Sequence, residues 1–163
     1  MPSDTLTTLA TLVGSKLKAK GLMLATAESC TGGWVAQAVT VIAGSSEWFE
    51  RGFVTYSNAA KMEMLRVKAD TLRTHGAVSE QTAGEMAAGA LARSRAQVAV
   101  AITGIAGPDG GSAEKPVGTV CFAWAMKSGA VSAETRQFKG DRESVRRQSV
   151  LAALQGILKL LED

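Results

Sequence analysis

Cysteine, histidine and aromatic residues are all scarce in this sequence of 163 residues. Its two cysteines are too few for a disulfide framework, and they fit free thiols in a reducing compartment. One histidine and two distant cysteines give no metal-ligand spacing, so we expect no metal site. One tyrosine, three tryptophans and four phenylalanines offer no platform for stacked bases, and the net charge of +3 forms no dense basic stripe. We therefore expect no nucleic-acid partner, and a small anionic ligand fits this composition better.

Long apolar runs are also absent. No segment approaches the roughly 20 apolar residues that span a bilayer, and the polar N-terminus has no signal-peptide pattern. We therefore expect no membrane partner and a cytoplasmic location. The length fits a single domain over residues 1–163, and a hydrophobic content of 46% can form its core without disulfide or metal crosslinks.

Apolar runs alternate with helical periodicity along the chain. The runs that we predict as strands cover residues 22–27, 52–56, 97–102, 117–125 and 131–138. A turn at Lys127-Ser128-Gly129 joins the last two, which indicates an antiparallel hairpin. Segments with apolar residues at helical spacing precede and follow the other predicted strands. The predicted fold class is α/β: a three-layer α/β/α sandwich around a mostly parallel mixed sheet of about five strands with an antiparallel element.

The first predicted strand ends in a run of small and polar residues, from Thr26 to Trp34, before a helix begins. Ser29 in this turn would lie at a helix N-terminus, where free backbone N–H groups can receive an anion or a developing oxyanion. A plainer interpretation is that Ser29 or Thr31 only caps the helix.

Two further segments follow predicted strands and carry polar groups. They are Tyr56-Ser57-Asn58-Ala59-Ala60-Lys61, in which Asn58 can cap a short helix, and the glycine-dense loop 103–111. In an open α/β sheet, ligands bind beyond the carboxyl ends of the parallel strands. We therefore expect a hydroxyl, a lysine and exposed backbone amides to meet in one crevice.

A serine nucleophile needs a base within hydrogen-bond reach and an oxyanion hole. Lys61 can be that base only if its amine is neutral, which partial burial near a helix N-terminus would favour. A solvated surface lysine is the alternative. A triad through His75 and a thiolate nucleophile at Cys30 are rival possibilities, and Cys30 can equally be a small buried apolar residue.

The loop 103–111 matches neither the Walker pattern nor the dinucleotide-binding fingerprint. Its glycines still allow close approach of a ligand and can offer N–H groups to a phosphate, although a long turn is the simpler interpretation. Arg142, Arg146 and Arg147 form a basic cluster on the last predicted helix, by default an exposed face. Arg142 is the arginine of this cluster best placed to reach a phosphate.

Taken together, these segments resemble the CinA C-terminal domain family in its stand-alone form. The likeness covers nearly the whole chain, and the matching motifs are residues 26–33, 51–58 with Lys61, 75–79, 103–111 and 115–120. The resemblance implies hydrolysis of the carboxamide of nicotinamide mononucleotide to nicotinate mononucleotide and ammonia, in the recycling of pyridine nucleotides. It also implies a serine/lysine mechanism, which falls on Ser29 and Lys61, and no metal or organic cofactor.

We therefore expect Ser29, Lys61 and Tyr56 to be catalytic, with Tyr56 orienting Lys61 or the ribose. The residues that we expect to bind the nucleotide lie in the same segments: Glu28, Cys30, Thr31, Gly32, Gly33, Asn58, Thr103, Gly104, Gly107, Gly110, Gly111 and Arg142. A non-catalytic nucleotide-binding or regulatory module is the alternative. Trp48, Phe49 and Phe53 could form an exposed apolar patch, which favours a homo-oligomer.

Overall fold

A five-stranded mixed sheet forms the centre of the molecule. The computed structural model describes residues 4–162, and its strands are β1 (Leu24–Glu28), β2 (Phe49–Val54), β3 (Val98–Gly104), β4 (Thr119–Met126) and β5 (Val131–Gln137). Their order is β2-β1-β3-β4-β5. Strand β1 pairs in parallel with β2 and β3, whereas β4 is antiparallel to both β3 and β5. Four strands therefore run in one direction and only β4 opposes them, which confirms the predicted mixed sheet.

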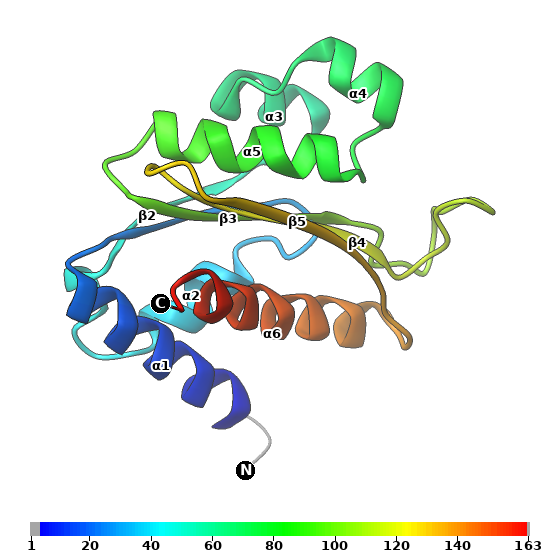
Figure 1. Ribbon diagram of the computed structural model, residues 1–163. Coiled ribbons are helices and arrows are strands. Elements are labelled where there is room, and N and C mark those ends of the chain that lie inside the picture. Colours follow the sequence, from blue (N-terminus) through cyan, green and yellow to red (C-terminus); the bar gives the residue numbers. More distant parts are fainter. Residues whose placement is uncertain (1–3, 163) are drawn as a thin grey trace.

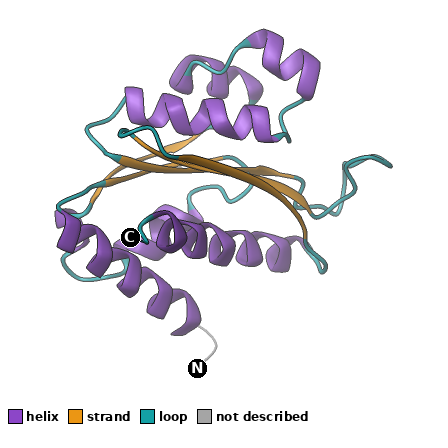
Figure 2. Cartoon of the chain, in the orientation of Figure 1, coloured by secondary structure: helices purple, strands orange, loops and turns teal. Residues whose placement is uncertain are grey.

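Helices cover both faces of this sheet (Figures 1 and 2). One layer holds α3 (Asn58–Leu65), α4 (Ala69–His75) and α5 (Glu80–Ala92). The other holds α1 (Asp4–Lys20), α2 (Trp34–Thr40) and α6 (Arg142–Leu160). A short 3-10 turn, η1 (Ser45–Glu47), precedes β2. The three-layer sandwich expected from the sequence is confirmed.

Side-chain size differs between the two faces of the central strands. On β3, Val98, Val100 and Ile102 pack toward α1, α2 and α6, while Ala99 and Ala101 pack toward α5. Helix α5 is itself rich in alanine and glycine on its buried face. Small residues on both sides let α5 lie close to the sheet, whereas the larger residues fill the opposite layer.

Several element boundaries differ from the predicted ones. Strand β1 begins two residues later than expected, and β2 covers Phe49–Val54 rather than residues 52–56. Asn58 does not cap α3, because Ser57 occupies that position and its hydroxyl accepts the Ala60 N–H at 3.0 Å. The hairpin prediction is confirmed, with the Met126 N–H donating to Ala130 O across the turn at 2.8 Å.

The predicted exposed apolar patch does not form. Trp48 is 4% exposed and belongs to the core between the sheet and α1, and Phe49 and Phe53 are half-buried. Trp48 lies directly over Gly14 of α1, where a Cβ would come within 2.5 Å of the indole ring. The homo-oligomer stays a prediction, without the patch that suggested it. No helix in the described part of the chain has the length and hydropathy needed to cross a membrane.

Candidate active site

The three parallel strands β2, β1 and β3 end on the same side of the sheet, as predicted. A cavity of about 240 Å³ lies beyond their carboxyl ends. Its walls come from the turn after β1, the start of α3, the segment between α4 and α5, the end of β3 and α6. The lining residues are Ser29, Cys30, Tyr56, Asn58, Lys61, Ala77, Val78, Thr103, Gly104, Ala106 and Arg142.

Ser29 is the first residue after β1 and is held by the sheet itself. Its N–H donates to Ile102 O of β3 at 2.9 Å, so the hydroxyl is fixed between two neighbouring strand ends. The Ser29 Oγ lies 2.9 Å from Lys61 Nζ and 3.3 Å from Tyr56 O. The serine and the lysine predicted to meet are therefore in direct contact.

Lys61 is buried, with only 1% of its surface exposed. Its amine contacts Ser29 Oγ and two backbone carbonyls, Thr55 O and Tyr56 O, each at 3.0 Å. Among residues 4–162 no carboxylate forms an ion pair with it. Burial lowers the pKa of Lys61 from its usual 10.5, and the opposing influence of Cys30 is smaller. The amine is therefore biased toward its neutral form, and the solvated-lysine interpretation is wrong.

Cys30 lines the cavity but is only 6% exposed, and it is a poor nucleophile here. Burial raises the pKa of its thiol to about 12, so the thiolate is rare at neutral pH. The nearby Glu28 carboxylate adds to this effect, while Arg146 and Lys61 oppose it. A thiolate mechanism at Cys30 is therefore disfavoured.

Glu28 supports the turn rather than facing the cavity. Its side chain is 0% exposed, and its carboxylate accepts hydrogen bonds from the Thr31 hydroxyl and from the N–H groups of Val35 and Ala36, at 2.6 to 3.0 Å. These two N–H groups are free donors of the first turn of α2, and a carboxylate at this position is favourable. The plainer interpretation, in which Ser29 or Thr31 caps α2, is wrong. Gly33 occupies the cap position, and the Glu28 carboxylate accepts the free N–H groups at that helix end.

The turn that follows Ser29 uses some of its own amides internally. The Gly32 N–H donates to Ser29 O, and the Trp34 N–H donates to Thr31 O, each at 3.0 Å. The remaining amides of the turn, those of Cys30, Thr31 and Gly33, donate to no carbonyl or carboxylate of residues 4–162. Gly32 and Gly33 both adopt positive φ angles, which a side chain would disfavour. Of Cys30, Thr31 and Gly33, it is Cys30 that lines the cavity with Ser29.

Two arginines of α6, four residues apart, bind the backbone around the cavity. Arg142 donates to Gly107 O at 2.7 Å, and its second nitrogen lies 3.5 Å from the Tyr56 hydroxyl. Arg146 donates to Cys30 O and Thr31 O, each at 3.1 Å. The sequence interpretation treated Arg146 as part of an exposed helix face; the spacing of four from Arg142, which places both on one side of a helix, was the signal available.

The segment predicted as a loop over residues 103–111 contributes its first residues, which are the end of β3, to the cavity and not its last. Thr103 and Gly104 line it, and the Thr103 hydroxyl donates to Ala77 O at 2.8 Å. Gly107 reaches the site through the hydrogen bond from Arg142 to its carbonyl. Gly110 and Gly111 are exposed and lie outside the lining. Three residues of the turn after Ser29 also lie outside it: Thr31, Gly32 and Gly33.

Tyr56 and Asn58 lie at the entrance of the cavity. The Tyr56 side chain is 63% exposed, and the atom that contacts Lys61 is the backbone carbonyl of Tyr56 rather than its hydroxyl. The contact between Tyr56 and Lys61 is therefore made through the main chain, and the orientation of Lys61 or the ribose by the Tyr56 side chain stays a prediction. The lining residues Ala77 and Val78, from the segment between α4 and α5, were missed because apolar side chains there carry no sequence signal of a site.

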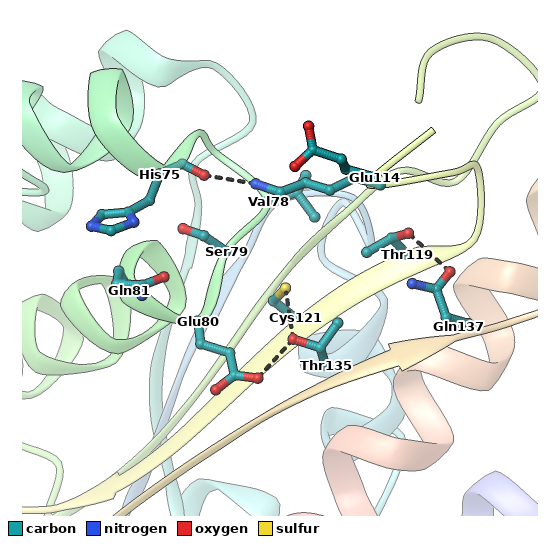
Figure 3. A pocket seen from close by; sticks show the side chains of 11 residues that line it. His75, Val78, Ser79, Glu80, Gln81, Glu114, Thr119, Cys121, Thr135 and Gln137 are labelled. Atoms are coloured by element: carbon teal, nitrogen blue, oxygen red, sulfur yellow. Dashed lines mark hydrogen bonds between the residues drawn. The ribbon is translucent and has the colours of Figure 1, made fainter. Parts of the chain in front are cut away.

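A second cavity, of about 430 Å³, shares Val78 with the Ser29 cavity in its lining (Figure 3). It is polar and includes His75, Ser79 and Cys121, but these do not form a nucleophile–base pair. The Ser79 hydroxyl donates to Gly76 O and accepts the Thr82 N–H, which caps α5. Burial raises the pKa of the Cys121 thiol, which contacts Thr135 at 3.4 Å. His75 lies outside the Ser29 cavity, so the triad alternative is wrong.

The described residues hold no cluster of three or more histidine, cysteine or acidic side chains that could bind a metal ion. The fold and the site together define an α/β protein with a buried serine–lysine pair, set at the carboxyl ends of parallel strands. Serine–lysine pairs also occur in known serine hydrolases.

Comparison with known proteins gives the family. The CinA C-terminal domain matches residues 6–161, and the chain belongs to that family. The nicotinamide-nucleotide amidohydrolase PncC of Escherichia coli strain K12 is 59% identical over 155 residues, which cover 95% of this chain and 94% of that protein. The PncC of Pseudomonas putida is 54% identical, covering 96% and 98%. The crystal structure of the competence/damage inducible protein CihA from Agrobacterium tumefaciens has a TM-score of 0.95 at 51% identity, over 97% and 96% of the two chains.

Proposed function

We propose that this protein hydrolyses the carboxamide of nicotinamide mononucleotide to nicotinate mononucleotide and ammonia, and that it serves the recycling of pyridine nucleotides. The observation that carries the chemistry is the contact of 2.9 Å between Ser29 Oγ and a buried Lys61 amine. The substrate is suggested by relatives of 54% and 59% identity that are named nicotinamide-nucleotide amidohydrolases.

The surroundings of Lys61 suit a base. A neutral amine has two hydrogens, and Thr55 O and Tyr56 O can only accept. When the amine donates one hydrogen to each of these carbonyls, the lone pair of Nζ faces Ser29 Oγ. The pyridinium ring of the substrate carries a positive charge, so its arrival should further favour the neutral amine.

The reaction then follows in two halves. Lys61 takes the proton of the Ser29 hydroxyl while Oγ bonds to the carboxamide carbon. The protonated amine returns this proton to the leaving nitrogen as the C–N bond breaks, which releases ammonia and leaves an ester on Ser29. Water then gives a proton to Lys61 and bonds to the ester carbon; Ser29 leaves and regains its proton from Lys61, and the nicotinate product departs.

The oxyanion of each tetrahedral intermediate needs hydrogen-bond donors that are already in position. The N–H group of Cys30 is the candidate, because Cys30 lines the cavity whereas Thr31 and Gly33 do not, and the N–H groups of Gly32 and Trp34 are already bonded within the turn. One such donor is typically worth roughly 2.7–4 kcal/mol in the transition state. We assign the 5′-phosphate to Arg142, which supplies the positive charge, and to the Thr103–Gly104 end of β3, whose backbone a phosphate can approach closely.

The test is the release of ammonia and nicotinate mononucleotide from nicotinamide mononucleotide by the purified protein, with and without a metal chelator. We expect equal turnover in both, because Ser29 and Lys61 need no metal. Binding of the nucleotide without turnover would instead favour the non-catalytic module. Turnover that disappears with the chelator would point to a metallo-amidohydrolase.

A further inference from the structure

We propose that Arg146 is a positioning residue of the oxyanion hole, acting through the backbone of the turn that follows Ser29. This inference rests on the proposed function, because it assigns a part of the same site. Arg146 does not line the cavity, and its guanidinium approaches the turn from the α6 side.

Arg146 holds two successive carbonyls of the turn. Its Nε donates to Cys30 O and its Nη2 to Thr31 O, each at 3.1 Å, while the guanidinium carbon lies 5.5 Å from the centre of the Trp34 ring. A planar guanidinium fixed at two nitrogens and against an aromatic ring has little freedom to turn. Gly32 allows this approach, since a Cβ there would lie 3.3 Å from Arg146 Nη2.

The hydrogen bonds from Arg146 affect the site through Cys30, which follows Ser29, lines the cavity and has an N–H that donates to no carbonyl or carboxylate of residues 4–162. In a trans peptide the C=O and the following N–H point in opposite directions. Because Cys30 O faces Arg146, the Thr31 N–H of the same peptide group points away from α6, and it has no acceptor among the residues that the structure describes. Thr31 O likewise shares its peptide group with the Gly32 N–H, which closes the turn on Ser29 O.

The charge of Arg146 acts on the same groups. No carboxylate within residues 4–162 forms an ion pair with this arginine, so its hydrogen bonds are directed to the two carbonyls. Arg146 therefore fixes the main chain of the turn directly after Ser29. Of the residues in this turn, Cys30 lines the cavity, and we assign its N–H to the oxyanion.

The experiment compares Arg146→Gln and Arg146→Lys with the wild type, and Arg147→Gln is the matched control on the next residue of α6. Arg147 lines a separate cavity beside Leu6 and Trp34. The readouts are kcat and KM for ammonia release from nicotinamide mononucleotide, the pH profile of kcat/KM, and the rate at which p-nitrophenyl acetate acylates Ser29, with Ser29→Ala as blank. Thermal unfolding reports whether each variant is folded.

We expect Arg146→Gln to lower kcat and the acylation rate by about 10-fold to 100-fold, part of the loss typical of a missing oxyanion donor. KM should stay within about twofold, and the pH midpoint should not move, because Lys61 is untouched. Arg146→Lys should recover part of the rate, since one ammonium can replace one of the two hydrogen bonds. Arg147→Gln should match the wild type.

Wild-type kcat and acylation rate in a folded Arg146→Gln protein would overturn the inference, and so would a rise in KM at unchanged kcat. If Arg146→Gln does not fold, Arg146→Lys decides by the same criteria. A wild type that is acylated at Ser29 but releases no ammonia would refute the proposed substrate alone, and the acylation rates of the variants would still test Arg146.

Discussion

Lys61 is an unusual lysine because its amine lies inside the protein and has no acidic partner among residues 4–162. Taking an ammonium group out of water is costly, and in practice such a group shifts its pKa and loses its proton. A structural role would be served equally well by an apolar side chain of similar length. The amine lies 2.9 Å from a serine hydroxyl, which is the position that a general base requires.

Replacing Lys61 by Arg should abolish most of the activity. Arginine keeps the positive charge but cannot act as a base, because its guanidinium does not lose a proton in this pH range. General-base catalysis typically contributes 10²–10⁴-fold, so we expect kcat to fall by about that factor. Initial rates of ammonia release measure this, and wild-type rates in a folded Lys61→Arg protein would exclude Lys61 as the base.

The lowered pKa of Lys61 also predicts how activity and stability depend on pH. Activity should rise with pH as the amine loses its proton, with a midpoint below the usual 10.5. Between the folded and unfolded pKa values of this lysine, the unfolded chain binds more protons than the folded one. The free energy of unfolding of the wild type, measured relative to Lys61→Met, should therefore increase as pH rises through that window.

Urea titrations of both proteins at several pH values measure this difference, and Lys61→Met is the control because it cannot titrate. Other ionisable groups contribute equally to both proteins and cancel. A difference that does not change with pH would mean that the pKa of Lys61 is the same in the folded and unfolded chains.

Cys30 should be dispensable for the chemistry. Because its thiol has a pKa of about 12, it stays protonated at neutral pH, and we expect Cys30→Ala to retain kcat within about threefold. The substitution leaves a small void, with an expected loss of about 1 kcal/mol in the free energy of unfolding. Ammonia release measures the effect on kcat, and urea denaturation measures the effect on the free energy of unfolding. A loss of kcat as large as that expected for Lys61→Arg would indicate that Cys30 is the nucleophile.

At the scale of elements, the position of Lys61 depends on how α3 packs against α5. The contact is close because Gly89 of α5 has no side chain: a Cβ there would lie 2.0 Å from Leu65 O, at the end of α3. Lys61 lies one turn earlier on α3, so this glycine sets the distance between α5 and the helix that carries Lys61.

Gly89→Ala should therefore push α3 outward and disturb the Ser29–Lys61 contact. We expect a loss of about 1–3 kcal/mol in the free energy of unfolding, together with a fall in kcat. Gly84→Ala is the matched control on the same helix, since nothing lies within 4 Å of its added Cβ. It should stabilise the protein by up to about 1 kcal/mol, because alanine is the better helix former. Equal stability of the two variants would contradict this account of the contact.

At the scale of the whole molecule, the meeting of three strand ends could be predicted from chain order alone. Alternating apolar runs and helical spacing predicted the layers. Because parallel strands end on the same side of the sheet, the order of the chain also predicted that Ser29 and Lys61 lie close together. What the sequence could not predict was which atoms face the cavity. Glu28 looked like a ligand-binding carboxylate until its three partners in the turn and in α2 were visible.

The same limit explains the errors at the surface. Trp48 carries no periodic pattern that distinguishes a core residue from a surface one, and only the space above Gly14 decides where its ring lies. Arg146 was interpreted as solvated because a charged helix residue usually is, whereas its partners are two main-chain carbonyls more than one hundred residues away in the chain.

The most direct test of the central claim is the turnover of nicotinamide mononucleotide by Ser29→Ala, measured as ammonia release beside the wild type at equal concentration. The account predicts that turnover falls to the level of the blank, while the melting temperature and the affinity for nicotinate mononucleotide stay close to those of the wild type, because only one oxygen atom is removed. Ammonia release at a wild-type rate by this folded variant would contradict the assignment of Ser29 as the nucleophile.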